Sequence, residues 1–125
     1  MKTAACLVLC LVAGGTVHLR AAEAAGLPVP TDAELAKIRE AAPEKPTVAP
    51  RSPRRVLVFS LVPTGYVHSA IPYGEAALRI IAEKTGAFSV ECSNNIAMFE
   101  PENLNRFDAV FFNNTNSALF LPGDF

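Results

Sequence analysis

The stretch Arg54-Arg55-Val56-Leu57-Val58-Phe59-Ser60 determines the class of fold. Residues 56–59 form an unbroken apolar run, whereas a strand with one wet face would alternate apolar and polar residues. We therefore expect a strand that is buried on both faces. Turn-forming residues 63–65 end the run, and a helical pattern begins near Ser69 or Pro72. A strand, a turn-rich loop and a helix together make the first half of a βαβ unit.

Three further segments extend this unit into a parallel sheet. Residues 72–84 carry apolar side chains at helical spacing, and Gly86 supplies the left-handed cap that ends such a helix. Residues 88–92 alternate apolar and polar side chains, which predicts a half-buried strand, at an edge of the sheet. Residues 109–112 are a second unbroken apolar run and are expected to be another buried parallel strand. The pattern is that of an α/β protein.

Polar side chains follow two of these strands at the points where they end. In α/β folds the loops that leave the carboxyl ends of the strands hold the ligand. If residues 56–59 and 109–112 are parallel neighbours, these ends lie side by side. The groups expected to converge there belong to Ser60, Tyr66, His68, Ser69, Asn113, Asn114 and Thr115. A histidine among amides and hydroxyls suits a polyhydroxylated ligand such as a sugar.

Several of these residues also have a purely structural interpretation. His68 has the alternative role of a loop histidine that bonds a backbone carbonyl, and Ser69 that of a helix cap. Asn113 and Asn114 are of the type that closes turns. Asn113-Asn114-Thr115 also fits the N-glycosylation pattern. A strand end inside a ligand site argues against a bulky glycan there.

The N-terminus has the pattern of a secretory signal peptide. A positive start at Met1-Lys2 precedes the apolar residues 3–17, and Ala22-Glu23-Ala24 offers an A-x-A cleavage site. A membrane-spanning helix needs about 20 apolar residues, more than this segment has, so no stable membrane anchor is expected. Residues 1–24 are therefore predicted to be a signal peptide, cleaved near Ala24, of a periplasmic or secreted protein.

Residues 25–53 are predicted to be a short helix and a linker. Thr31 and Glu34 form a capping-box pattern at the start of the helix, and Pro43 ends it. Four prolines between residues 43 and 53 then favour an extended connector. The globular domain is expected to occupy residues 54–125.

Composition and missing motifs exclude several classes of function. The formal net charge is −1 and the one basic cluster, residues 51–55, is expected to be a solvated flank of a strand, so no nucleic-acid binding is predicted. The sequence has no paired-histidine metal spacing, P-loop or G-x-G-x-x-G, so neither a metal nor a cofactor is predicted. Cys92 lacks the small neighbours of a nucleophile elbow and is expected to be a semi-buried structural thiol. Asp108, at the amino end of its strand, is expected to fix a turn.

Four segments match motifs in the order in which a known family carries them. They are Arg55-Val56-Leu57-Val58-Phe59, Gly65-Tyr66-Val67-His68-Ser69-Ala70-Ile71-Pro72, Lys84-Thr85-Gly86-Ala87-Phe88 and Phe107-Asp108-Ala109-Val110-Phe111-Phe112-Asn113-Asn114-Thr115. Together they resemble the trehalose-utilisation (ThuA-like) family. Its members commonly show an aromatic-x-His-Ser-x-Ile-Pro segment after the first strand, a Lys-Thr-Gly helix end and an Asp-Ala-Val strand that ends in Asn and Thr.

The resemblance implies a class I glutamine-amidotransferase-like, flavodoxin-type α/β sandwich and a role in carbohydrate metabolism. His68 matches the loop histidine of the family, and Asn113-Asn114-Thr115 match the end of its third strand. We therefore expect an exported domain that acts on or binds a sugar or sugar derivative, with His68 as acid/base or orienting group. The alternatives are a non-catalytic carbohydrate-binding or interaction module and, third, a glutamine amidotransferase.

Family members continue with a Gly-rich strand, a loop that bears another histidine, and further βα units, which this sequence does not contain. Residues 54–125 are thus expected to be the N-terminal part of such a domain, with only its first βαβ portion. The chain by itself is not expected to be catalytically active. Buried parallel strands normally need helices on both faces, and only residues 72–84 offer a full connecting helix, so a stable monomer is not expected either.

Overall fold

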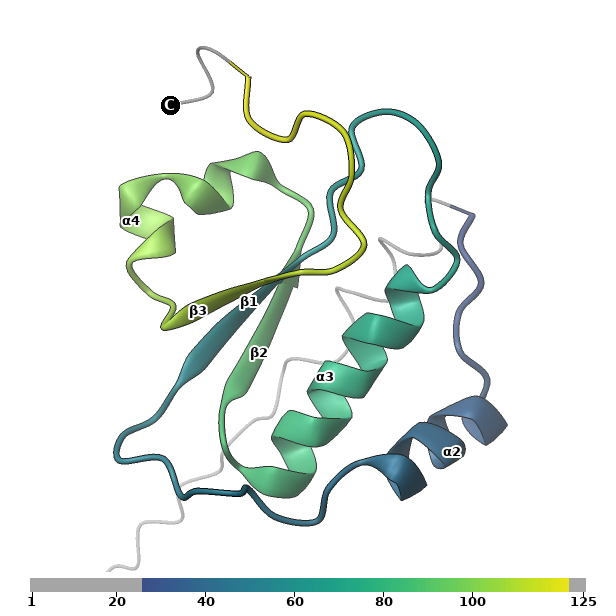
Figure 1. Ribbon diagram of the computed structural model, residues 1–125, viewed down its shortest axis with the longest axis vertical. Coiled ribbons are helices and arrows are strands. Elements are labelled where there is room, and N and C mark those ends of the chain that lie inside the picture. The colour runs from purple at the N-terminus through teal and green to yellow at the C-terminus, as the bar shows by residue number, and fades with distance from the viewer. Residues whose placement is uncertain (1–25, 122–125) are drawn as a thin grey trace, which may run out of the picture.

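A three-stranded parallel sheet forms the centre of the computed structural model, which describes residues 26–121 (Figure 1). The elements in chain order are α2 (Asp32–Ala41), β1 (Arg55–Phe59), α3 (Ile71–Thr85), β2 (Ser89–Ser93), the 3-10 helix η1 (Ile96–Phe99), α4 (Pro101–Leu104) and β3 (Ala109–Phe112). The strand order is β2-β1-β3, with α3 on one face of the sheet and η1 with α4 on the other. The predicted α/β class, a partial flavodoxin-like fold, is confirmed.

The predicted signal peptide, residues 1–24, lies outside the described residues. Within residues 26–121, no helix combines the length and the apolar character that a membrane crossing requires.

The central strand, β1, is buried on both faces, as its apolar run predicted. Leu57, Val58 and Phe59 have no exposed surface. Leu57 and Phe59 point to the same face, because side chains alternate along a strand, and pack against Met98 of η1. Val58 points to the opposite face, and its partner in the register, Cys92 of β2, is buried there too. The core therefore has two halves, one on each face of the sheet.

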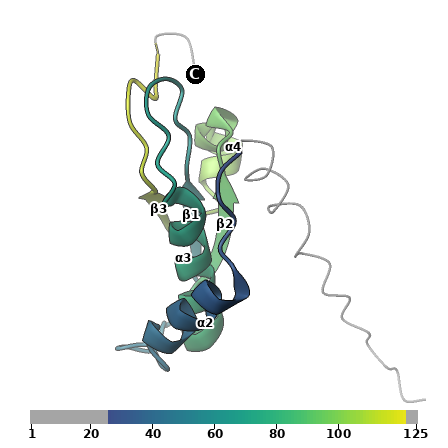
Figure 2. The ribbon, with the colours of Figure 1, turned by 90° about the vertical axis from the view of Figure 1, so that its right-hand side faces the viewer.

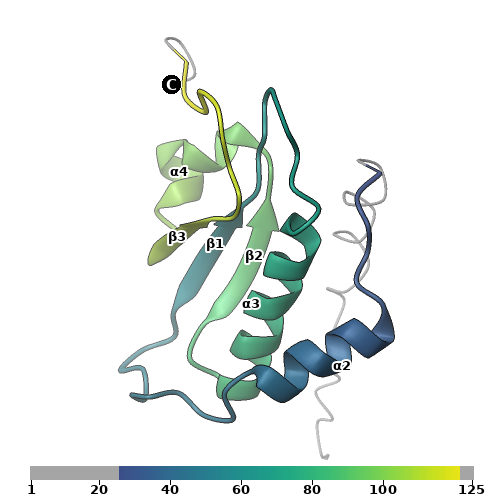
Figure 3. The ribbon, with the colours of Figure 1, turned by 45° about the vertical axis from the view of Figure 1, so that its right-hand side comes forward.

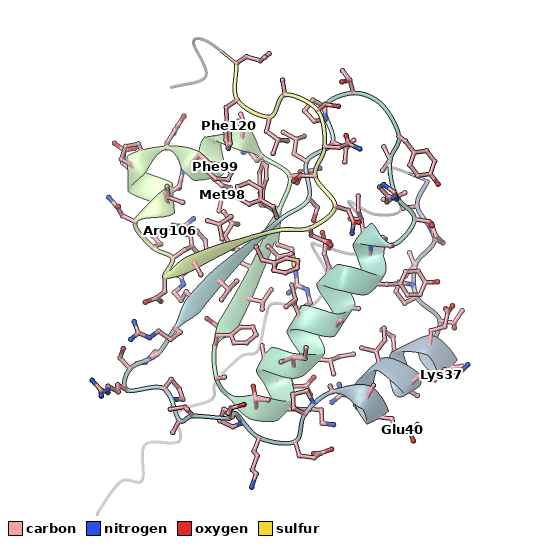
Figure 4. The ribbon with its side chains drawn as sticks, in the orientation of Figure 1. Lys37, Glu40, Met98, Phe99, Arg106 and Phe120 are labelled. Atoms are coloured by element: carbon pink, nitrogen blue, oxygen red, sulfur yellow. The ribbon has the colours of Figure 1, made fainter. Side chains whose placement is uncertain are left out.

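The η1 half of the core also contains a cluster of aromatic rings. The ring of Phe99 lies edge-on to those of Phe59 and Phe120, with centroids 4.8 Å apart in both pairs, and stacks on Phe112 at 5.8 Å. Figure 4 shows Met98, Phe99 and Phe120 gathered on this side of the sheet. The segment between β2 and β3 thus serves as the second covering layer, although it contains little regular helix.

Helix α3 begins and ends where the sequence predicted. Pro72 lies in its first turn, where the missing N–H has no cost. Gly86 ends it with φ of 62°, in the left-handed region that glycine adopts without strain. The residue before the helix is Ala70, and no side chain caps its N-terminus. Ser69 therefore does not cap the helix, contrary to its alternative structural role.

The expectation that β3 is buried on both faces is wrong. Phe111 and Phe112 are each 46% exposed, and Ala109 is exposed as well. The reason is its position, because β3 is an edge strand and α3 packs on β2 at the other edge. Phe111 shares the face of Val58 by register, so it lies where α3 does not reach. The apolar run correctly predicted that residues 109–112 form a strand, but it did not predict that this strand is partly exposed.

Helix α2 packs on α3 rather than on the sheet (Figure 3). Thr31 and Glu34 form the predicted capping box. Two side-chain contacts join the helices: Arg39 Nη2 lies 2.8 Å from Glu83 Oε2, and Tyr73 donates its hydroxyl proton to Glu34 at 3.0 Å. Hydrogen bonds from the Thr31 backbone and hydroxyl lower the pKa of Glu34, and the Tyr73 hydroxyl adds to the effect.

Lys84 completes the contact between α2 and α3. Its Nζ atom donates to the carbonyl oxygens of Arg39, at 2.6 Å, and Ala42, at 2.8 Å, and forms an ion pair with Glu44. These carbonyls belong to the last turn of α2 and the residue that follows it, where a helix has no partners of its own. On the far side of α2, Lys37 and Glu40 point into solvent (Figure 4).

The amino edge of the sheet carries ion pairs. Arg54 Nη1 lies 2.7 Å from Asp108 Oδ1, and Arg55 Nη2 lies 3.2 Å from Glu91 Oε2. Asp108 also accepts a hydrogen bond from the backbone N–H of Arg55 at 2.8 Å. This N–H, followed by the Arg54 guanidinium, lowers the pKa of Asp108. Asp108 therefore ties the start of β3 to the start of β1.

Candidate functional site

A hydrogen-bond network joins the carboxyl ends of β1 and β3 to the first turns of α3. Ser60, the first residue after β1, donates its hydroxyl proton to Glu75 Oε1 at 2.7 Å. Asn113, the first residue after β3, directs Nδ2 to Ser60 Oγ at 3.4 Å and to the carbonyl oxygen of Ile71 at 2.9 Å. The parallel pairing of β1 with β3 brings these ends together, as the sequence argument required.

Asn113 is the centre of this network. It is 3% exposed, and its backbone N–H bonds the Phe59 carbonyl at 2.8 Å, which extends the ladder beyond β3. Its Oδ1 accepts a hydrogen bond from Asn114 Nδ2 at 3.1 Å. Asn114 itself has φ of 53°, a left-handed conformation that asparagine tolerates. The network therefore runs from a buried amide to an exposed one.

The loops after β1 and β3, residues 60–70 and 113–121, lie side by side (Figure 2). Asn116 Nδ2 donates to the carbonyl oxygen of Tyr66 at 2.9 Å, and Ser117 Oγ donates to that of Thr64 at 2.8 Å. We call these two loops together the loop pair. Because side chains of one loop bond the backbone of the other, each loop fixes the conformation of its neighbour.

Tyr66 and His68 are two exposed residues of the loop pair whose rings are in contact. Their rings lie edge-on with centroids 4.8 Å apart, and Tyr66 is 69% exposed. The carbonyl oxygen of His68 accepts the N–H of Ile71 at 3.2 Å, which anchors this loop to the start of α3. The imidazole and the phenol are thus held on a fixed backbone and remain accessible.

The seven residues singled out from the sequence fall into separate groups. The structure brings together Ser60, Asn113 and Asn114 in one network, and Tyr66 and His68 in one ring pair. Ser69 is exposed and Thr115 is half-buried, in the same two loops. A single site composed of all seven remains a prediction.

Three residues of the site were missed from the sequence. Glu75 was not singled out from the sequence, yet its carboxylate accepts a hydrogen bond from the Ser60 hydroxyl. Asn116 and Ser117 were not singled out either, although each donates a hydrogen bond to the backbone of the neighbouring loop. The sequence places Glu75 in the first turns of the helix that begins near Pro72. Its hydrogen-bond partner lies in another segment of the chain, and no sequence pattern predicts such a pair.

Cys92 lies beneath α3 and not in the loop pair. It is 4% exposed, and burial raises the pKa of its thiol to about 12, with the Glu75 carboxylate acting in the same direction. Arg79 of α3 lies against it and opposes this shift. The Nη2 atom of Arg79 is itself buried, without a hydrogen-bond partner among residues 26–121. At neutral pH the thiol is protonated, which fits the predicted structural role.

Within the described part of the chain, no three histidine, cysteine or carboxylate side chains gather as metal ligands would. Fold and site together define an α/β protein whose uncharged loops adjoin at the carboxyl edge of a parallel sheet. Comparison with known proteins adds no family, because no family model, no curated protein and no solved structure matches the chain.

Proposed function

We propose that this chain is an exported, ThuA-like domain that binds a sugar or sugar derivative on the loop pair. The observation that carries the proposal is the exposed Tyr66–His68 ring pair beside the amide-rich residues 113–117. A sugar presents both C–H faces and hydroxyl groups. A tyrosine ring supplies an apolar surface with a polar tip, and asparagine amides both donate and accept hydrogen bonds. The groups present therefore complement a polyhydroxylated ligand.

His68 is the group that we assign to proton transfer. A general acid or base must reach the proton that it moves, and the imidazole is exposed in the loop that would hold the ligand. In this proposal the ligand hydroxyls are held or oriented by Ser60, Ser69, Asn113, Asn114 and Thr115. The predicted signal peptide at residues 1–24 supports export to the periplasm or beyond.

A non-catalytic carbohydrate-binding module is the second candidate, and one observation favours it. Residues 60–70 and 113–121 contain one histidine, His68, and no aspartate or glutamate. Glu75 is close by but accepts the Ser60 hydroxyl proton. A pair of acid and base groups, on which glycoside hydrolysis usually depends, is thus not formed by these two loops.

A glutamine amidotransferase is not proposed. That chemistry requires a reactive thiolate. Cys92 is buried beneath α3, and its pKa of about 12 keeps the thiol protonated at neutral pH.

The test is to titrate the full chain with trehalose and with methyl glucoside, followed by amide chemical shifts and by calorimetry. We expect shifts at residues 60–70 and 113–117, and weaker binding in the Tyr66→Ala variant. Val48→Ala is the matched control, because Val48 is exposed but belongs to the linker before β1. Absence of binding to every sugar tested would overturn the proposal.

Catalysis requires a separate measurement. A turnover assay on each sugar that binds, repeated with His68→Ala, decides between the two candidates. Turnover that falls in the variant supports an enzyme, and turnover that does not change removes His68 from the mechanism. Binding without any product supports the module.

A further inference from the structure

We infer that the loop pair selects an uncharged saccharide and discriminates against sugars that carry a phosphate or carboxylate. The inference rests on the proposed function and deepens it, because it concerns the class of ligand at the same site. Three observations carry it. The first is the distribution of charged residues. The second and third are the starts of α3 and η1, where the backbone N–H groups that could bind an anion already donate to other atoms of the protein.

The loops at the carboxyl ends of the strands lack the charged residues that the amino ends carry. The segments that leave the carboxyl ends of β1, β2 and β3, residues 60–74, 93–99 and 113–121, contain no Asp, Glu, Lys or Arg. At the opposite edge, Arg54, Arg55 and Arg106 pair with Asp108 and Glu91. A bound phosphate or carboxylate is normally matched by an arginine or lysine. None of these three segments supplies such a cation.

The start of α3 is closed to an anion. A helix N-terminus binds phosphate through free backbone N–H groups. Here the N–H of Ile71 donates to the His68 carbonyl, and Pro72 has no N–H. Both residues are buried, and Ile71 is 5% exposed. The one long helix that begins at this edge therefore offers little to a phosphate.

The start of η1 is closed in the same way. The N–H of Asn95 donates to Ser93 Oγ at 3.1 Å, and the N–H of Ala97 donates to Asn95 Oδ1 at 3.1 Å. Side-chain oxygens thus occupy the positions that an anion would take in a nest of backbone N–H groups. At the starts of both α3 and η1, backbone N–H groups that could bind an anion therefore already donate hydrogen bonds within the protein.

The charged side chains nearest to this edge do not help an anion. Glu75 is itself a carboxylate, bonded to Ser60 at 2.7 Å. Arg79, one turn further along α3, lies against Cys92, and its unpartnered Nη2 atom is buried. Part of the guanidinium is therefore buried beside Cys92, and Arg79 does not belong to the loop pair. A phosphate brought to the loop pair would give up water without gaining a cation, which is costly.

The experiment compares methyl glucoside, glucose 6-phosphate and glucuronate on the full chain by calorimetry at low salt. We expect methyl glucoside to bind at least about tenfold more tightly than either anionic sugar. Equal or tighter binding of glucose 6-phosphate or glucuronate would overturn this inference and leave the proposed function intact. Binding of none of the three would overturn the proposed function itself, and this inference with it.

A charge placed in the loop tests where the ligand sits. We expect Val67→Arg to raise the affinity for glucose 6-phosphate relative to that for methyl glucoside about two- to fivefold, the range of an exposed ion pair. Val67 is 42% exposed, between Tyr66 and His68. Val48→Arg, at an exposed linker position, adds the same charge elsewhere and is expected to have no effect. An equal gain in both variants would show a response to net charge alone and would overturn the inference.

Discussion

Asn113, the first residue after β3, lies against Gly74 in the first turn of α3, so closely that a Cβ atom on Gly74 would overlap Asn113 Oδ1. The contact is held by the bond from Asn113 Nδ2 to the Ile71 carbonyl at 2.9 Å. Glycine is disfavoured inside helices because of its conformational freedom. Here its missing side chain makes room for a buried amide, and it is this amide that connects the strand end to the helix.

Asn113→Ala should lower the free energy of unfolding by about 1–3 kcal/mol, because it removes the bonds to Ile71 and Ser60 and leaves a buried carbonyl without its donor. Urea unfolding followed by circular dichroism measures the change. Asn94→Ala, an exposed asparagine in the loop after β2, is the control and should stay within about 0.5 kcal/mol. Equal losses in the two variants would contradict the central role of Asn113.

Gly74→Ala should destabilise the protein, although the same change in an open helix position stabilises by about 1 kcal/mol. The added methyl group must displace the Asn113 amide from its hydrogen bonds. The measurement is a double-mutant cycle, in which Gly74→Ala is repeated in the Asn113→Ala background. We expect the loss to disappear there. If Gly74→Ala instead stabilised the protein with Asn113 in place, the Asn113–Gly74 contact would not restrict the residue at position 74.

Much of the fold was predicted from the sequence because its signals are local. The apolar run of β1, the capping box of Thr31 and Glu34, and the cap at Gly86 each act within a few residues. The 3-10 helix η1 was missed, because Asn94 and Asn95 indicate a loop. In the structure Asn95 instead caps η1, with Oδ1 accepting the N–H of Ala97.

The site was predicted less well, because its geometry depends on partners far apart in the chain. The polar residues after β1 and β3 were correctly placed at adjacent strand ends. The bond from Ser60 to Glu75 and the contact of Asn113 with Gly74 follow from how α3 lies across the sheet. The exposure of Phe111 has the same origin, since burial of an apolar run depends on which strand the helix covers.

Cys92 should make the protein less stable as the pH rises above about 9. Its pKa is about 12 in the folded state and about 8.5 in an unfolded chain, so between these values the unfolded state has lost a proton that the folded state retains. The unfolding free energy then falls by about 1.4 kcal/mol per pH unit. Other groups titrate in this range, so the measured quantity is the difference in slope from Cys92→Ala between pH 9 and 11. Parallel slopes would contradict the assignment.

The exposed edge formed by β3 should promote self-association. Phe111 is 46% exposed on the face that α3 leaves open, and the outer side of β3 has no neighbouring strand among residues 26–121. Sedimentation velocity over a range of concentrations should show association that Phe111→Thr weakens and that the exposed control Val48→Thr does not. A monodisperse monomer at all concentrations would contradict this, as well as the expectation from sequence that the chain is not a stable monomer.

The ammonium group of Lys84 makes the stability of helix α2 depend on helix α3. It donates to the carbonyls of Arg39 and Ala42, so the last turn of α2 is completed by a side chain of α3. An isolated helix of ten residues is marginal in water. We therefore expect helix α2 to be stable only where it is packed on α3, whose side chain supplies these bonds. A peptide of residues 26–45 would remain mostly unfolded by itself.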